Sequence, residues 1–271
     1  MKKKIKPIYF VLLFFLVIIL CYLLRGPLFA WNPIKIGFKK IKTSKAVIYI
    51  KDMTERDSVV YRIDEIILEE EKFHDLKYVD DFKIIILDKD SNMKRYVPWL
   101  KGSGFSVSLS LVDLIYIGPT ARKSPSGIEP YLKHELSHLL IDQNTTFKKA
   151  LEIHEQGWFA EGIAEYFSGH SFYKKSEFLE VCRMNNFDFT SLYEKNPLKM
   201  SIREVRLRYT FYRFFIEFLV ENYGMKRLQD YLKKYINNPG DYKELFVEVY
   251  SSDLTKLLDK FNSSLNWRDK P

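Results

Sequence analysis

The residues best suited to chemistry lie in the segment His134–His138, which reads HELSH. On a helix, His134 and His138 stand four positions apart, so both imidazoles project from one face and can bind one metal ion, with Glu135 beside them. A catalytic zinc takes three protein ligands and keeps a fourth position open. The segment therefore predicts a hydrolytic zinc site that still lacks one ligand.

The helix that this site needs is predicted by the residues around it. Leu132, Leu136, Leu139 and Leu140 are spaced for one buried stripe, and Pro130 suits a first helical turn. A buried helix whose histidines are ordinary core residues would share this pattern. Two histidines and an acid on one short helix favour the metal site.

A second segment, Trp158–Tyr166, supplies the missing ligand. It is also predicted to be helical, with Glu161 and Glu165 one turn apart on the same face. Glu161 is the candidate third ligand. Glu165 is the candidate partner of a ligating histidine, because a metal-bound imidazole usually donates its other N–H to a carboxylate or carbonyl. A solvated acidic face is the alternative, but Gly162 and Ala164 between the two acids indicate close helix packing.

The two segments, written HExxH and WxxEGxAEY, resemble the gluzincin zinc metallopeptidases, and most closely the small bacterial peptidases of the MA clan. The resemblance covers roughly residues 45–265. It implies an α+β fold, with a zincin-like lobe containing a small sheet and the HExxH helix, followed by a mostly helical C-terminal lobe. A GxMEN motif is absent, which favours an endopeptidase. A metzincin would need glycine and histidine where the chain has Ile141 and Asn144.

The resemblance also implies zinc as cofactor, a peptide or protein as substrate, and a role for each residue. Zinc lowers the pKa of its bound water to about 7, while Glu135 acts as general base and then as general acid. A downstream tyrosine is expected to stabilise the oxyanion. Tyr209 is the candidate and Tyr212 the alternative. His154 is a distant alternative for the third zinc ligand.

The amino terminus predicts a membrane anchor. Residues 1–6 carry four lysines, and Ile8–Leu24 is a run of 17 residues without a charge, near the lower limit for spanning a bilayer. The poor cleavage site that follows favours an uncleaved anchor over a signal peptide. The lysines favour an inside amino terminus and thus a single-pass protein with an extracellular catalytic domain.

The chain is expected to comprise a tip and transmembrane helix, a juxtamembrane linker, the zincin-like catalytic lobe and the helical C-terminal lobe, at residues 1–30, 31–45, 46–170 and 171–271. Strands are predicted at residues 46–50, 82–87 and 105–117. The last part, Leu114–Ile117, is the candidate edge of the substrate cleft. Further helices are predicted at residues 58–73, 225–235, 241–250 and 254–265, together with an apolar helix that has Tyr209 at its head and ends near Tyr223. Zinc should lie between the two lobes.

The net charge of +8 and the pI near 9.1 could indicate a nucleic-acid-binding protein. Because the basic residues are scattered and no nucleic-acid motif accompanies them, an anionic membrane or cell-wall surface is the simpler partner, and a merely basic surface explains the charge equally well. Two function classes follow, a membrane-anchored zinc endopeptidase and a catalytically silent binding or regulatory module. A structural zinc usually has four protein ligands, so three ligands beside Glu135 favour the enzyme.

Overall fold

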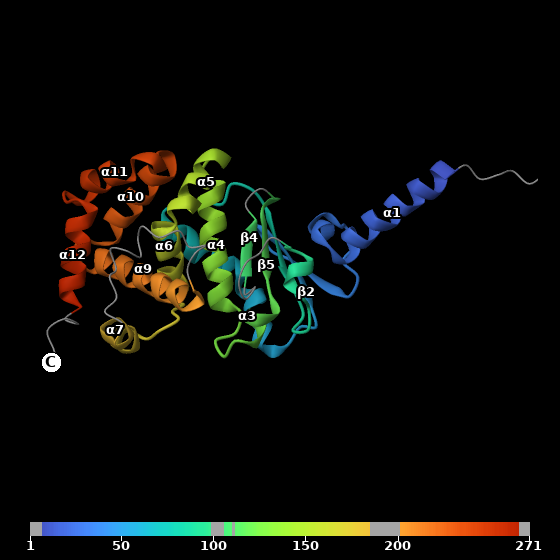
Figure 1. The fold of residues 1–271 in the computed structure, drawn as a ribbon, viewed down its shortest axis with the longest axis horizontal. Helices are drawn as coiled ribbons and strands as arrows, with labels where there is room; N and C mark the ends of the chain where they lie inside the picture. Colours follow the sequence, from blue (N-terminus) through green and yellow to red (C-terminus); the bar gives the residue numbers. More distant parts are fainter. Residues whose placement is uncertain (1–6, 99–105, 110–111, 185–200, 266–271) are drawn as a thin grey trace, which may run out of the picture.

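A computed structural model describes residues 7–98, 106–109, 112–184 and 201–265. The fold is α+β, as predicted, with a five-stranded sheet on one side and a group of helices on the other (Figure 1). Helix α4 (Glu129–Gln143), which carries the HELSH segment, lies between them (Figure 1). The basic tip at residues 1–6 and most of the predicted loop at residues 96–104 lie outside the described residues.

The sheet has the strand order β1-β2-β3-β5-β4. The three central strands are parallel to one another, and the two outer strands run antiparallel to their neighbours. The strands are β1 (Phe38–Lys42), β2 (Ala46–Lys51), β3 (Phe82–Ile86), β4 (Ser106–Leu109) and β5 (Leu114–Ile117). Near-continuous apolar runs such as those of β3 and β5 are typical of strands buried on both faces.

The prediction that Leu114–Ile117 forms the cleft edge is wrong. All four residues are buried, and this strand pairs with β3 on one side and with β4 on the other. The edge strand on this side of the sheet is β4, whose residues are all half-buried. A short apolar run does not by itself distinguish an edge from a central strand, whereas a strand that mixes serines with apolar residues suits an edge with two different faces.

The segment predicted as a linker is built into the sheet. It follows the short helix η1 (Pro27–Trp31) and contains β1, which pairs with β2. The Lys35 ammonium is buried and donates to the carbonyls of Phe29 and Asn32 at 2.9 and 2.8 Å. Burial lowers the pKa of Lys35 to about 8. The lysine-rich sequence of β1 hides its strand character, but charged side chains suit an exposed sheet edge.

Helix α1 (Pro7–Arg25) projects from the sheet side of the molecule (Figure 1). Its large apolar side chains are exposed. Within the described residues, no helix has both the length and the apolarity needed to cross a membrane. This finding contradicts the predicted single-pass anchor and the extracellular location derived from it. An uncharged run of 17 residues rises about 26 Å as a helix, less than the ~30 Å of a typical hydrocarbon core.

One face of the sheet is covered by helices α2 and α4, and the shared core consists mainly of isoleucine, leucine and valine. The predicted helix at residues 58–73 is divided, because its first part belongs to a 3-10 helix with a Thr54–Asp57 capping box. The remaining elements of this half are η2 (Glu55–Arg62), α2 (Ile63–His74), η3 (Met93–Arg95) and α3 (Pro119–Lys123). A smaller apolar cluster with Phe29 and Met93 packs on the other face of the sheet.

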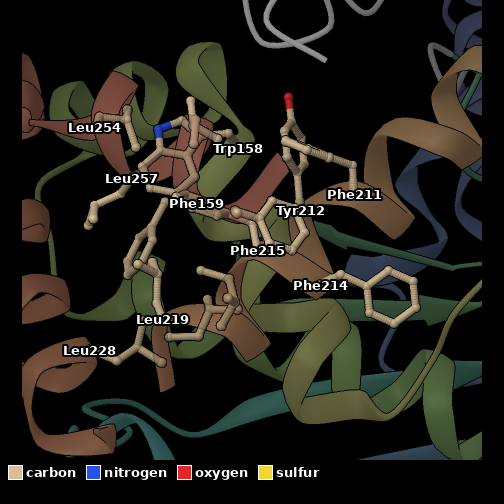
Figure 2. Packing of buried hydrophobic residues seen from close by; sticks show 14 of the residues in the cluster. Trp158, Phe159, Phe211, Tyr212, Phe214, Phe215, Leu219, Leu228, Leu254 and Leu257 are labelled. Carbon is tan, nitrogen blue, oxygen red and sulfur yellow. The ribbon is translucent and has the colours of Figure 1, made fainter. Parts of the chain in front are cut away.

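The helical half has an aromatic core that includes Trp158, Phe159, Phe211 and Phe215 (Figure 2). Its elements are α5 (Phe147–Gln156), α6 (Trp158–Ser168), α7 (Lys175–Met184), α9 (Ile202–Tyr223), α10 (Met225–Asn237), η6 (Pro239–Asp241), α11 (Tyr242–Tyr250) and α12 (Leu254–Ser264). The predicted apolar helix ends at Tyr223 as expected but begins earlier than Tyr209, at a Ser201–Glu204 capping box, and forms α9. Helix α5 was not predicted.

Candidate metal centre

The two histidines of helix α4 point their Nε2 atoms toward each other. These atoms are 3.1 Å apart, and the two rings meet edge to face with centroids 4.8 Å apart. The four-residue spacing on the helix produces this convergence, as predicted from the sequence. His134 and His138 thus offer two nitrogen ligands to one point, with only 13% and 8% of their side chains exposed.

Helix α6 brings Glu161 to the same point. Gly157, with a φ of +66°, allows the sharp turn between α5 and α6, so that Glu161 lies in the first turn of α6. The Glu161 Oε2 atom is 3.3 Å from the Nε2 atoms of His134 and His138. Across the part of the chain that the structure describes, these three residues are the one group of three or more possible metal ligands.

The geometry of this group fits a tetrahedral zinc ion. Ligand atoms at about 2.0–2.1 Å from a tetrahedral zinc lie about 3.3–3.4 Å apart, and the three ligand atoms here are 3.1, 3.3 and 3.3 Å apart. Glu161 Oε2 is buried and lies 3.3 Å from the Nε2 atom of each imidazole. A cation would satisfy this oxygen together with both nitrogens.

The electrostatics of the group also favour a cation. Burial alone would raise the pKa of Glu161, but the charges and hydrogen bonds of His138 and His134 outweigh it and hold this pKa well below its usual range. Burial opposes protonation of His134, yet the neighbouring Glu161 and Glu165 raise its pKa to about 10. The cluster therefore stabilises positive charge at its centre, as a metal site must.

Glu135 lies next to the ligands and outside their cluster. Its carboxylate is buried, and its Oε1 atom accepts a hydrogen bond of 2.8 Å from the Ser106 hydroxyl on the edge strand β4. One carboxylate oxygen is therefore held by the sheet edge. This placement suits the predicted role as a general base.

Of the two candidate tyrosines, Tyr209 is nearer to the ligands. Its ring stacks beside that of His134, with centroids 6.5 Å apart. Burial, followed by the charge of Glu161 and a hydrogen bond to it, raises the pKa of Tyr209 well above its usual range, so the hydroxyl keeps its proton. Tyr212 is buried in the aromatic core, and its hydroxyl accepts a hydrogen bond from Arg208 (Figure 2). The geometry favours Tyr209 as donor.

His154, the distant alternative for the third ligand, lies on α5 outside the cluster. Its Nε2 atom is 3.1 Å from Asp142 Oδ1, and this hydrogen bond raises the pKa of the imidazole. The predicted partner Glu165 is close to the ligands, with its Oε1 atom 3.5 Å from His134 Nδ1.

Two polar residues at the centre were missed by the sequence analysis. Ser106 contacts Glu135, and His170 Nδ1 lies 2.8 Å from Glu165 Oε2. Nothing in the pattern around Ser106 indicates that contact, because it joins a strand to a distant helix. The sequence gives a weak indication of the contact made by His170. A glycine directly after a helix allows the chain to turn back, and His170 follows Gly169 at the end of helix α6.

No protein-family model matches the chain, and no curated protein matches it either. Among solved structures, native leukotriene A4 hydrolase from Saccharomyces cerevisiae aligns with 87% of this chain and 39% of its own, at 10% identity and a TM-score of 0.44. A second structure of the native yeast enzyme aligns with 86% and 39%, at 12% identity and a TM-score of 0.48. The chain thus spans about two fifths of the length of these proteins. At TM-scores this low, the likeness carries no argument.

Proposed function

We propose that this protein is a zinc-dependent metallopeptidase that cleaves peptide bonds within extended or partly unfolded proteins. The observation that carries the proposal is the triangle of ligand atoms from His134, His138 and Glu161, with Glu135 beside it. Three ligands leave a fourth position open, which distinguishes a catalytic from a structural zinc site. The endopeptidase assignment rests on the missing GxMEN motif.

Each residue has a defined task in this reaction. His134, His138 and Glu161 would hold the zinc, which when bound supplies a Lewis acid that activates water and polarises a carbonyl. Glu135 takes a proton from the attacking water and passes it to the leaving amine. Ser106 fixes one Glu135 oxygen so that the other faces the reacting groups. Tyr209, a neutral hydroxyl, donates a hydrogen bond to the developing oxyanion.

The proposal is tested with the full-length protein and its Glu135→Gln variant. Zinc content is measured by elemental analysis, and cleavage is followed on an unfolded protein substrate. We expect one zinc per chain in both proteins, since Glu135 is not a ligand. Cleavage by the variant should fall by about 10²–10⁴-fold, the range for loss of a general base.

Either of two results would overturn the proposal. A wild-type protein without stoichiometric zinc would remove the metal centre, and a variant that cleaves as fast as wild type would remove the role of Glu135. Zinc binding with no cleavage of any peptide bond by wild type would favour the binding or regulatory module instead.

A further inference from the structure

The carboxylate of Glu165 lies between two imidazoles. Its Oε1 atom is 3.5 Å from His134 Nδ1, and its Oε2 atom is 2.8 Å from His170 Nδ1. Only 3% of the Glu165 side chain is exposed. Because His134 turns its Nε2 atom toward Glu161 and His138, Nδ1 is the atom that remains for Glu165.

The chain around His170 is arranged to hold this contact. Gly169 ends helix α6 with a φ of +68°, a left-handed conformation in which glycine is the least strained residue. The Ser168 hydroxyl then accepts a hydrogen bond from the backbone N–H of His170 and donates one to the carbonyl of Glu165, each 3.1 Å long. The backbone therefore brings His170 back over the helix that carries Glu165.

Aromatic rings enclose the His170 imidazole. The ring of Tyr131, on the catalytic helix, has its centroid 5.1 Å away, and the ring of Phe172 stands edge to face at 4.6 Å. With 12% of its side chain exposed, His170 is shielded from bulk water. A hydrogen bond between an imidazole and a carboxylate is stronger in such surroundings than on the surface.

We propose that His170 is a positioning residue of the metal centre, which orients the ligand His134 through Glu165. The inference rests on the proposed function, because the role is defined relative to the metal. His170 Nδ1 lies within hydrogen-bond distance of a carboxylate, so it donates a hydrogen bond to Glu165. A carboxylate fixed at one oxygen cannot rotate freely, and its second oxygen, 3.5 Å from His134 Nδ1, then orients the imidazole of His134.

The second histidine ligand lacks such support. His138 Nδ1 is buried and has no hydrogen-bond partner among the residues that the structure describes. Of the two histidine ligands, His134 is therefore the one whose ring is oriented by outer residues, Glu165 and His170. Loss of an outer partner of a ligating histidine typically lowers metal affinity by about 10–100-fold, and we expect His170 to reach this range.

The test measures zinc affinity of the full-length protein by competition with a chromophoric chelator. Two amide variants give a matched pair. His170→Asn can place an N–H near the position of Nδ1, whereas His170→Gln places its amide further out, near the position of Nε2. We expect zinc binding by His170→Gln to weaken by about tenfold or more, and His170→Asn to retain most of the wild-type affinity.

The double variant with Glu165→Gln and His170→Gln, compared with Glu165→Gln alone, shows whether His170 acts on zinc affinity through Glu165 or through the stability of the fold. If His170 acts through Glu165, the loss caused by His170→Gln should largely disappear in a Glu165→Gln background, because the link is already broken. Additive losses in the double variant would overturn the inference, as would wild-type affinity in His170→Gln. Equal weakening in His170→Asn and His170→Gln, together with lower thermal stability of the metal-free proteins, would indicate a structural role and overturn it too.

The outcome for wild type keeps the two proposals distinct. Stoichiometric zinc in wild type with no effect of His170→Gln overturns only the role of His170. Absence of zinc from wild type overturns the proposed function, and this inference with it.

Discussion

Two largely buried clusters of glutamate and histidine each include residues of helix α4, and their electrostatics are opposite. The metal cluster comprises His134, His138 and Glu161, and the neutral cluster comprises Glu70, His74 and Ser137. In the metal cluster, the pKa of Glu161 is lowered and that of His134 is raised, so charges are favoured. In the neutral cluster, burial raises the pKa of Glu70 well above its usual range and lowers that of His74 to about 4.

The opposite pKa shifts of the two clusters come from the different hydrogen-bond partners of their carboxyl and imidazole groups. In the neutral cluster, Ser137 donates to Glu70, and His74 Nδ1–H donates to the backbone carbonyl of Glu70 at 2.9 Å. The imidazole is thus engaged with the backbone, and burial disfavours charge on both groups. In the metal cluster, two imidazoles face one carboxylate oxygen, and their attraction exceeds the cost of burial. Residue type alone does not make a metal site; convergence of ligand atoms does.

The largest effect on zinc affinity is expected for Glu161→Gln in the metal cluster, and the same substitution in the neutral cluster, Glu70→Gln, is its control. Glu161→Gln removes a charge and a ligand, so zinc affinity should fall by more than the ~100-fold that outer-shell changes produce. Glu70→Gln replaces a carboxyl whose raised pKa favours the neutral form with an amide of the same shape. Its zinc affinity should stay close to that of wild type. Chelator competition checks both variants, and equal losses would contradict the comparison.

A second prediction concerns the close approach of helices α6 and α9, which holds Glu161 in place. A Cβ atom on Gly162 would lie 2.9 Å from Ile216 Cγ1 and 3.1 Å from the Tyr212 carbonyl oxygen. We expect Gly162→Ala to cost about 1–3 kcal/mol of unfolding free energy through overpacking, offset in part by up to about 1 kcal/mol of helix propensity. Zinc affinity should fall as well, because α6 moves.

The matched control for this change is Gly240→Ala, since a Cβ atom there meets no other atom within 4 Å. Urea unfolding of the two variants measures the difference. If Gly162→Ala were as stable as Gly240→Ala and bound zinc equally well, the position of Glu161 would not depend on the packing of α6 against α9.

A third prediction sharpens the role of Glu135, which lies beside the metal cluster. Ser106→Ala removes the hydrogen bond to Glu135 Oε1, so the catalytic rate should fall by about tenfold, the effect of losing a hydrogen bond to a charged group. Zinc content should not change. Ser108→Ala is the control, because the buried Ser108 hydroxyl has no hydrogen-bond partner in the described segments. A similar rate for all three proteins would contradict the orienting role of Ser106.

The smallest effect is a change in the pH dependence of stability. Folded Glu70 keeps its proton above the pH at which an unfolded glutamate loses it, near pH 4.5, so its contribution to stability is lost as the pH rises. The lowered pKa of His74 acts in the other direction, with stability lost as the pH falls from 6.5 to about 4.

Urea unfolding of metal-free wild type and Glu70→Gln at a series of pH values from 4.5 upward tests this prediction. The wild type should lose up to about 1.4 kcal/mol per pH unit relative to the variant, which has no proton to release. Parallel pH dependence of the two proteins would mean that folded Glu70 is ionised, and the contrast between the clusters would fail.

Local patterns account for the parts of the fold that sequence reasoning found. The spacing of His134 and His138, the helix that carries them and the amphipathic helices near the carboxyl terminus all depend on neighbours within one or two turns. Strand β1 and helix α5 were missed. The lysine-rich sequence of β1 has a weak pattern that only pairing with β2 stabilises, and the limits of α5 depend on turns at Thr146 and Gly157.

The sequence by itself determined that His134 and His138 share one helix face, because a spacing of four residues has this result in any helix. The same periodicity determined that Glu161 and Glu165 share a face of helix α6. Tertiary structure alone decided that β4, and not β5, lies at one edge of the sheet, that Ser106 holds Glu135, and that His170 reaches Glu165. It also decided which buried acid keeps its charge, since Glu70 and Glu161 differ in the groups that distant segments bring to them.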